Sequence, residues 1–311
     1  MAIKKILITG GAGFIGSSLA HKLAKDQNNT IVIVDNLLTG SVDRIPKLEN
    51  VKFIKADVNN NKEISSIFYN FSFDYVFHYA AVVGVKRTLE NPILVLDDLK
   101  GMRNILDLCK NTAVKRIFFS SSSEVYGEPV ELPQNEHTTP LNSRLPYAIV
   151  KNVGEAFLKS YKQEYDLDYT IFRFFNTYGP LQSKDFVISK FVAAALKNQD
   201  ITIYGDGSQT RTFCYVDDNI DACINAFLED QFINDVINIG SGKVYTVLEL
   251  AEVIVKVSKS NSKIVHLPAL EEGDMSRRQP DVSNMLQLLN KELASLEEGL
   301  EKLISNPTFF L

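Results

Sequence analysis

The stretch that decides the fold is ILITGGAGFIG, residues 6–16. Its first half is apolar and β-branched, which predicts a buried strand, and its second half is rich in glycine. Glycines in a G-x-G-x-x-G spacing between a strand and a helix allow a tight turn and the close approach of a dinucleotide's diphosphate. The N-terminus of the following helix adds backbone N–H donors and the positive end of its dipole. The predicted dinucleotide-binding residues of this turn are Gly10, Gly13, Phe14, Ile15 and Gly16.

Asp35 ends the next apolar run, TIVIVD (30–35), about twenty residues after the glycine turn. A carboxylate at this position accepts hydrogen bonds from the adenosine ribose in dinucleotide-binding folds. It also repels a 2′-phosphate, and the following residues NLL (36–38) offer no arginine to bind one. The predicted cofactor is therefore NAD and not NADP. Further expected cofactor contacts are Asn36, Asp57 and Val58, and a solvated loop position is the alternative for Asp57.

Short apolar runs alternate with stretches of helical periodicity over the first half of the chain. The predicted strands are KKILIT (4–9), TIVIVD (30–35), VKFIKAD (51–57), YVFHYAA (75–81), RIFFSSS (116–122) and YTIFRFF (169–175). The predicted helices lie near 14–26, 62–70, 92–112 and 147–165. Strands that are apolar on both faces and alternate with helices are typical of a parallel sheet. The predicted fold class is α/β, with a Rossmann-type doubly wound parallel sheet.

The rhythm of the chain changes after about residue 176. Turn signals such as TYGP (177–180) and YGDGSQ (204–209) are followed by less regularly spaced helices. These helices are expected near 186–198, 217–229, 246–258 and 293–304. We therefore expect an NAD-binding Rossmann domain over 1–175 and a smaller substrate-binding lobe over 176–311, with segments that could return to the first domain.

Composition limits the classes of partner. The 311 residues are 45% hydrophobic and carry a net charge of -5, which gives no reason to expect nucleic acid or a membrane as partner. The N-terminal apolar run is too short for a signal peptide or a spanning helix, so a cytoplasmic location is expected. Three scattered cysteines (Cys109, Cys214 and Cys223) and four dispersed histidines predict neither disulfides nor a metal site.

The fifth predicted strand runs directly into four serines (120–123) and Glu124. Tyr147 and Lys151 follow in PYAIVK, four residues apart, so they share one face of a helix. A neighbouring ammonium and a nicotinamide's positive charge both lower the pKa of a phenol, which makes such a tyrosine a proton acceptor. Because the serine run and the glycine turn end strands at one edge of the sheet, Ser122 is expected to share a substrate hydroxyl with Tyr147. An exposed helical pair is the alternative reading of Tyr147 and Lys151.

In combination these motifs resemble the extended short-chain dehydrogenase/reductase superfamily, in its nucleotide-sugar epimerase/dehydratase branch. FRFFNTYGP (172–180) and YGDGSQTRTFCYVDD (204–218) add to the resemblance, which covers nearly the whole chain. It implies a tightly held NAD that oxidises a sugar at C4, a second step on the 4-keto sugar, and a nucleotide-diphosphate sugar, first of all a UDP-sugar, as substrate. It also implies a homodimer formed through 92–112 and 147–165. The residues expected to bind the substrate are Ser122, Asn176, Arg211, Arg277 and Arg278.

The second step is left open between alternatives. Ser122 and Glu124, in SSEVYG, with RRQPD (277–281), resemble the pattern of UDP-glucuronate decarboxylases, in which C4 oxidation makes a β-keto acid that loses carbon dioxide. VVGVKRTLENP (82–92) and EEGD (271–274) look more like 4-epimerases. The acid of the Thr-Asp-Glu pattern of 4,6-dehydratases is missing. A decarboxylase is therefore expected first, a 4-epimerase second and a dehydratase third, and the contrasting class is a catalytically silent NAD-binding sensor.

Overall fold

The computed structural model describes residues 3–268 and 277–306, and the segment EEGD (271–274) lies outside the described residues. The chain divides into two compact units, each made of three segments. The first unit consists of Met1–Val125, Leu141–Arg173 and Ile220–Ile237. The second consists of Tyr126–Pro140, Phe174–Asn219 and Asn238–Leu311. Each unit therefore takes one segment from the other side of the boundary expected at residue 175.

A seven-stranded parallel sheet organises the first unit, in the order β11-β6-β5-β4-β1-β2-β3. The strands are β1 (Lys4–Thr9), β2 (Asn29–Asp35), β3 (Val51–Lys55), β4 (Tyr75–His78), β5 (Arg116–Ser122), β6 (Asp168–Phe174) and β11 (Asp235–Ile239). The chain order reverses between β1 and β4, which pair in parallel from Ile6 opposite Tyr75 to Thr9 opposite His78. Open parallel sheets bind ligands beyond the carboxyl ends of the strands at such a reversal point.

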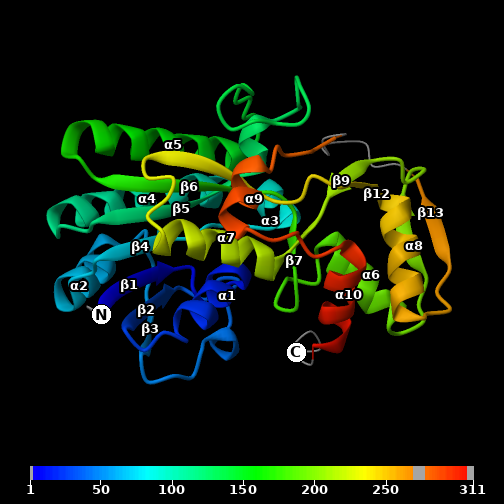
Figure 1. Cartoon of the computed structure of the whole chain (residues 1–311), viewed down its shortest axis with the longest axis horizontal. Coiled ribbons are helices and arrows are strands. Elements are labelled where there is room, and N and C mark those ends of the chain that lie inside the picture. The colour runs from blue at the N-terminus through cyan, green and yellow to red at the C-terminus, as the bar shows by residue number, and fades with distance from the viewer. Residues whose placement is uncertain (1–2, 269–276, 307–311) are drawn as a thin grey trace. The chain divides into compact units, whose positions relative to one another are not determined.

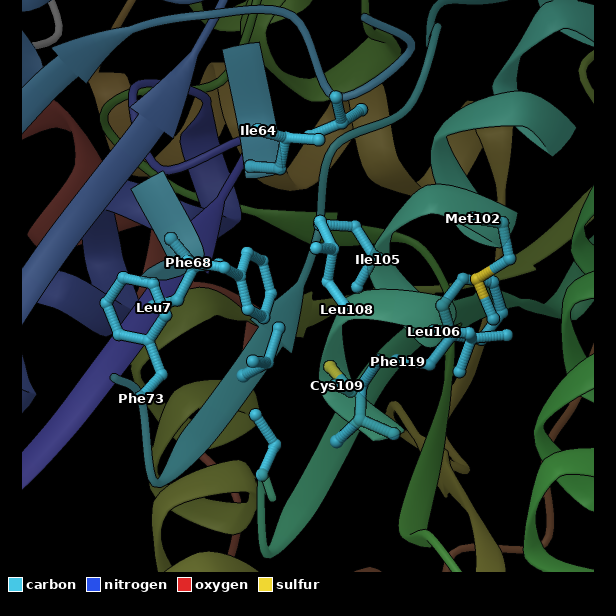
Figure 2. Close-up of a cluster of buried hydrophobic side chains, with 14 of the residues drawn as sticks. Leu7, Ile64, Phe68, Phe73, Met102, Ile105, Leu106, Leu108, Cys109 and Phe119 are labelled. Carbon is cyan, nitrogen blue, oxygen red and sulfur yellow. The ribbon is translucent and has the colours of Figure 1, made fainter. Parts of the chain in front are cut away.

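One face of this sheet is covered by α2 (Asn61–Phe71), α4 (Pro92–Asn111) and α5 (Pro146–Tyr165) (Figure 1). Figure 2 shows the apolar cluster beneath these helices, in which Phe68 of α2 and Ile105 of α4 lie with Leu7 of β1. Phe119 of β5 belongs to the same cluster. Its buried side chains remove a large apolar area from water, which is the main favourable term in folding.

The opposite face of the sheet is aromatic and packs against residues 220–228 of α7 (Val216–Leu228). Phe227 contacts the ring of Phe77 on β4 at a centroid distance of 5.7 Å and that of Phe118 on β5 at 5.6 Å. The helix α1 (Phe14–Leu23) is joined to α7 by an ion pair of 2.6 Å between Lys22 and Asp221. Alternate residues of β5 therefore face the two helical layers, as the period of a strand requires.

The second unit is built from short strands and helices. These elements are β7 (Thr177–Tyr178), α6 (Val187–Ala195), β8 (Ile201–Tyr204), β9 (Thr210–Thr212), β10 (Cys214–Tyr215), β12 (Val244–Thr246), α8 (Val247–Ser258), β13 (Ile264–Leu267), α9 (Ser283–Leu289) and α10 (Leu296–Ser305). Thr246 and Ser295 begin α8 and α10 with reciprocal capping boxes, which satisfy backbone N–H groups at both helix starts.

The predicted fold class is confirmed, and the eight predicted helices lie within about three residues of observed ones. The prediction missed β11, the seventh strand of the sheet, the short helices α3 (Val85–Glu90) and α9, and the short strands of the second unit. It was also wrong to expect β3 to be apolar on both faces, since β3 lies at the edge of the sheet and exposes two lysines. All three cysteines are buried and unpaired. No helix within the described ranges is long and apolar enough to cross a membrane.

Candidate active site

The glycine turn follows β1, and at Gly10 and Gly16 a side chain would collide with the backbone. Gly10 has a φ of 70°, and a Cβ there would lie 2.6 Å from the backbone nitrogen of Ala80. A Cβ on Gly16 would lie 2.4 Å from the carbonyl oxygen of Gly10. Because both distances are shorter than any real Cβ contact, only glycine lets the turn fold back on itself and α1 lie against it.

Gly13 is different, because a Cβ there would meet one described heavy atom within 4 Å, the carbonyl oxygen of Gly10 at 3.1 Å. Gly13 stands at the N-cap of α1, where no described side chain caps the helix and the first turn contains no acidic residue. The helix therefore presents its first N–H groups and the positive end of its dipole beside open space. These features fit the diphosphate of a dinucleotide, and NAD would be held there by residues 13–16.

Asp35 ends β2 and fixes the glycine turn. Its carboxylate accepts hydrogen bonds from the backbone N–H of Ala12 at 3.0 Å and of Leu37 at 2.8 Å. A carboxylate has about four acceptor positions, so these two bonds leave capacity for ribose hydroxyls. Asp35 therefore fits the role predicted for it toward NAD, and it also shapes the turn.

The remaining predicted cofactor contacts lie beside Asp35. The side-chain amide of Asn36 donates to the Asp57 carboxylate at 3.1 Å, so these two residues are brought together. The carbonyl oxygen of Val58 accepts a hydrogen bond from Asn104 of α4 at 2.9 Å. This loop is thus joined by hydrogen bonds both to the end of β2 and to α4, and its expected contact with the cofactor stays a prediction.

Ser122 is the last residue of β5, as predicted, and is 8% exposed. Its hydroxyl accepts a hydrogen bond of 3.2 Å from the backbone N–H of Glu124 and so caps a short 3₁₀ helix, η2 (Ser123–Tyr126). Glu124 is half-buried in this helix. The sharp end of the strand therefore places a hydroxyl and a carboxylate together at the carboxyl edge of the sheet.

Tyr147 and Lys151 lie in the first two turns of α5. The Lys151 ammonium donates to the carbonyl oxygen of Ser120 at 2.6 Å and lies 5.8 Å from the centre of the Tyr147 ring. The Tyr147 ring packs against an apolar group that includes Val82 and Val150. Lys151 is buried, so the pair is not the exposed helical pair that was the alternative.

One residue that the sequence did not indicate, Asp98 of α4, acts electrostatically on Lys151. Burial lowers the pKa of Lys151 to about 8, and the partly buried carboxylate of Asp98 on α4 opposes that shift. Burial raises the pKa of Asp98, which accepts a hydrogen bond of 2.7 Å from the backbone N–H of Val82. Burial also lowers the pKa of His78 to about 3, so this ring is neutral at pH 7. Asp98 lies in a predicted helix that contains several charged residues, so the sequence did not indicate that its carboxylate is partly buried.

The predicted substrate residues after position 175 belong to the second unit. The side-chain amide of Asn176 donates to the carbonyl oxygen of Thr212 at 3.0 Å, which brings it beside Arg211 of β9. Arg211 is 7% exposed and Arg278 is 9% exposed, whereas Arg277 is exposed to solvent. Arg211 donates through Nη1 to the carbonyl oxygen of Thr210 at 2.7 Å. The substrate-binding role of the three arginines stays a prediction.

The NAD dependent epimerase/dehydratase family matches residues 6–240. The chain belongs to this family. The family is described as NAD dependent, and relatives of this chain are named as UDP-glucose 4-epimerases and UDP-glucuronic acid decarboxylases. The chain is therefore an NAD-dependent nucleotide-sugar-modifying enzyme. The predicted family, enzyme class and cofactor are confirmed.

Three similar proteins of this family illustrate the range of reactions. A putative UDP-glucose 4-epimerase of Methanocaldococcus jannaschii is 37% identical over 308 residues, which are 96% of this chain and 97% of that protein. A UDP-N-acetyl-alpha-D-glucosaminuronate decarboxylase of Bacillus cytotoxicus is 37% identical over 318 residues, 97% of each chain. The structure of a UDP-glucose 4-epimerase of Thermotoga maritima with UDP-glucose has a TM-score of 0.90 and 32% identity, and covers 96% of this chain and 97% of that one.

Proposed function

We propose that the chain is an NAD-dependent decarboxylase of a UDP-linked uronic acid, with UDP-glucuronate as the first substrate to test. The observation that supports this most is the half-buried side chain of Glu124, which lies two residues after Ser122 and just beyond the end of β5. A 4-epimerase needs no carboxylate there, because its keto sugar has only to turn over and take the hydride back. A carboxyl group that takes up a proton and then donates it is useful when carbon dioxide leaves and the enolate must be protonated.

Bound NAD would supply the acceptor for a hydride from C4 of the sugar. In this proposal Tyr147 takes the proton of the C4 hydroxyl, and Lys151 favours the phenolate through its positive charge. Ser122 holds the same hydroxyl. The resulting 4-keto sugar is a β-keto acid, whose carboxylate at C6 leaves as carbon dioxide without a metal ion.

Glu124 is proposed to pass a proton from water to C5 of the enolate that remains after carbon dioxide leaves. The hydride would then return to C4 from the reduced cofactor, while Tyr147 gives its proton back to the C4 oxygen, so that a UDP-pentose forms and NAD is restored. We also propose that Asn176, Arg211 and Arg278 bind the anionic groups of the substrate, because guanidinium forks and side-chain amides suit diphosphate oxygens. Arg277, being exposed, is proposed to contribute charge alone. The contributions of Arg277 and Arg278 can be separated by replacing each with lysine, since the change at Arg278 should raise KM more.

A substrate screen tests the proposal directly. Purified protein with NAD is incubated in turn with UDP-glucuronate, its N-acetylamino counterpart, UDP-glucose, UDP-N-acetylglucosamine and dTDP-glucose. The mass of each product is then measured by mass spectrometry. Decarboxylation removes the mass of one carbon dioxide from a uronate, and dehydration removes the mass of one water. Conversion of the neutral sugars alone, with unchanged mass and an inverted C4, contradicts the proposal.

The variant Glu124→Ser sharpens this test. A decarboxylase is expected to lose turnover by a factor on the order of 10²–10⁴, as is usual for a missing acid or base. The matched control is Glu128→Ser, which removes an exposed carboxylate four residues further along the chain. Equal activity of the Glu124→Ser variant and the control would contradict a chemical role for Glu124.

The second candidate is a nucleotide-sugar 4-epimerase. The observations that favour it are the names of the Methanocaldococcus jannaschii and Thermotoga maritima relatives and the segment VVGVKRTLENP (82–92), which contains α3. An epimerase should tolerate Glu124→Ser, so the same variant distinguishes the two reactions.

We also propose that the chain forms a homodimer through α4 and α5. These helices pack against each other and expose apolar side chains to solvent, among them Ile93 (71%), Leu94 (38%) and Ile149 (38%). Apolar groups gathered on neighbouring helices are typical of a protein interface. Light scattering should give twice the mass of the chain for the wild type and a single-chain mass for Ile93→Asp. A single-chain mass for the wild type would contradict the dimer.

A further inference from the structure

A buried ion pair with a third partner joins three elements of the first unit. The Arg173 guanidinium of β6 donates through Nε to Oε1 of Glu155 at 2.9 Å and through Nη2 to Oε2 at 2.7 Å. Ser121 of β5 donates its hydroxyl to Oε1 of the same carboxylate at 2.5 Å. The side chains of Arg173 and Glu155 are each 2% exposed. This fork fixes the direction of both planar groups, which a point charge would not do.

The placement of this ion pair connects it to the proposed catalytic residues. Glu155 lies four residues after Lys151 and eight after Tyr147, so all three share one face of α5. Lys151 bonds to Ser120 and Glu155 bonds to Ser121, which are consecutive residues of β5. The next residue of that strand is Ser122. The contacts of Lys151 and Glu155 therefore fix the register of α5 relative to β5.

Gly154 lets α5 approach β5 closely enough for these contacts. A Cβ at this position would lie 2.6 Å from Cζ of the Phe119 ring, so a larger side chain would push the helix away from the strand. The side chains of Lys151 and Glu155 reach the strand on either side of that contact. The spacing between α5 and β5 is thus determined by packing at Gly154, and their register by the polar contacts.

Stability alone does not explain a fully buried pair of this kind. Replacing a buried ion pair by apolar residues of similar volume is often neutral or stabilising, whereas removing one partner leaves a buried charge and is strongly destabilising. What the pair provides in addition is one defined arrangement of the groups that it joins. The arrangement that it defines here is that of α5 relative to the end of β5.

We propose that Glu155 and Arg173, together with Ser121, are positioning residues that hold Tyr147 and Lys151 in place relative to Ser122. None of the three takes part in a chemical step. This inference rests on the proposed oxidation at C4, because Tyr147, Lys151 and Ser122 are the residues proposed to act in that step. Misplacement of a reacting group by about 1 Å can cost on the order of 10²-fold in rate, so a loosened register should appear in kcat.

The test compares Glu155→Gln with the double variant Glu155→Leu/Arg173→Met, using whichever nucleotide sugar the wild type converts. Glu155→Gln should lose stability and at least about tenfold in kcat, with KM and NAD affinity within about twofold of wild type. The double variant should recover stability, because no unpaired charge remains buried, and should not recover kcat. Recovery of both would show that the pair is structural only and would overturn the inference.

Arg116→Met is the matched control. Arg116 is also a buried arginine, 3% exposed, but it stands at the opposite end of β5 and donates through Nε to Thr170 at 2.9 Å. Its loss should reduce stability and leave kcat of the folded protein within about twofold of wild type. An equal fall of kcat in Arg116→Met and Glu155→Gln would also overturn the inference.

A readout without turnover separates this inference from the proposed function. Nuclear magnetic resonance of lysine side chains follows the ionisation of Lys151, with Lys151→Met to assign the signal. Because burial lowers the pKa of Lys151 to about 8, a loosened α5 should raise that pKa toward 10.5 in Glu155→Gln and leave it unchanged in Arg116→Met. If the wild type converts no nucleotide sugar, the proposed function fails, while an unchanged Lys151 signal in Glu155→Gln contradicts the positioning role.

Discussion

The buried ammonium of Lys151 donates to the main-chain carbonyl oxygen of Ser120 across 2.6 Å. This bond anchors the helix that contains Tyr147 to the strand that ends in Ser122. Burial lowers the pKa of this ammonium, whereas the carbonyl dipole stabilises its charged form. The charge in turn stabilises a nearby phenolate. Much of the chemistry proposed for this protein therefore depends on the ionisation of one lysine.

Replacement of Tyr147 by phenylalanine removes the proposed proton acceptor and little else. The ring packs beside Val82 and Val150, and phenylalanine preserves that packing. We expect turnover to fall by a factor on the order of 10²–10⁴, while NAD stays bound. Turnover and NAD content of the purified variant check this directly. Full activity in the variant would exclude Tyr147 as the base.

The pH dependence of activity should report Lys151. As the pH rises through about 8, the ammonium loses its proton and no longer favours the phenolate, so kcat/KM should fall above that pH. The charged or titratable groups facing Lys151 are Asp98 on α4, His78 on β4 and Tyr147 on its own helix. Asp98→Asn removes a negative charge that raises the pKa of Lys151, and should therefore move the fall to lower pH.

The control for that shift is Asp97→Asn. Asp97 is the neighbour of Asp98 on α4 and forms a surface ion pair of 2.7 Å with Lys100. Its replacement should leave the pH profile in place, because exposed charges are screened by water and salt. Identical profiles for wild type and Asp98→Asn would contradict the assignment of the alkaline limb to Lys151.

The same lysine predicts a pH dependence of stability. Lys151 gives up its proton at about pH 8 in the folded chain and near 10.5 in the unfolded chain. Between these values the unfolded chain binds more protons, so the free energy of unfolding should rise with pH, by up to roughly 3 kcal/mol from this residue. Urea unfolding of wild type and Lys151→Met, at one pH below this interval and one near its upper end, isolates the contribution. An equal change with pH in both proteins would contradict it.

The two kinds of glycine in the turn should respond differently to alanine. Gly10→Ala places a Cβ against the backbone of Ala80 at a positive φ, so it should lower the stability of the protein even without NAD. Gly13→Ala meets little of the chain and should mainly weaken NAD binding. Thermal unfolding and NAD titration of both variants separate these effects. Equal losses of stability would show that Gly13 is also required by packing.

Much of the first unit could be predicted because its signals are local. The glycine turn, the apolar strands and Pro at the start of α4 and α5 are read from neighbouring residues. Strand β11 was missed because it lies in a region of irregular spacing, where pairing with β6 and not local sequence decides its place. Long-range pairing of this kind leaves no periodic pattern in one segment.

The candidate site was also predictable only where its signals are local. The spacing of Tyr147 and Lys151 in PYAIVK and the serine run at the end of β5 are visible in the sequence. The roles of Asp98 and Glu155 are not, because a carboxylate on a helix reads as a solvated group until the packing of that helix is known. The second unit's Arg278 and Arg277 are adjacent in sequence, and only the structure distinguishes the buried one from the exposed one.

The most direct test of the account follows the hydrogen at C4. Protein with unlabelled NAD is given UDP-glucuronate carrying deuterium at C4, and the product is analysed by mass spectrometry and proton magnetic resonance. We expect a UDP-pentose that has lost carbon dioxide and carries the deuterium at C4, formed more slowly than from unlabelled substrate. A product that lost carbon dioxide without a deuterium effect on rate and with solvent hydrogen at C4 would contradict it, as would a uronate left unchanged.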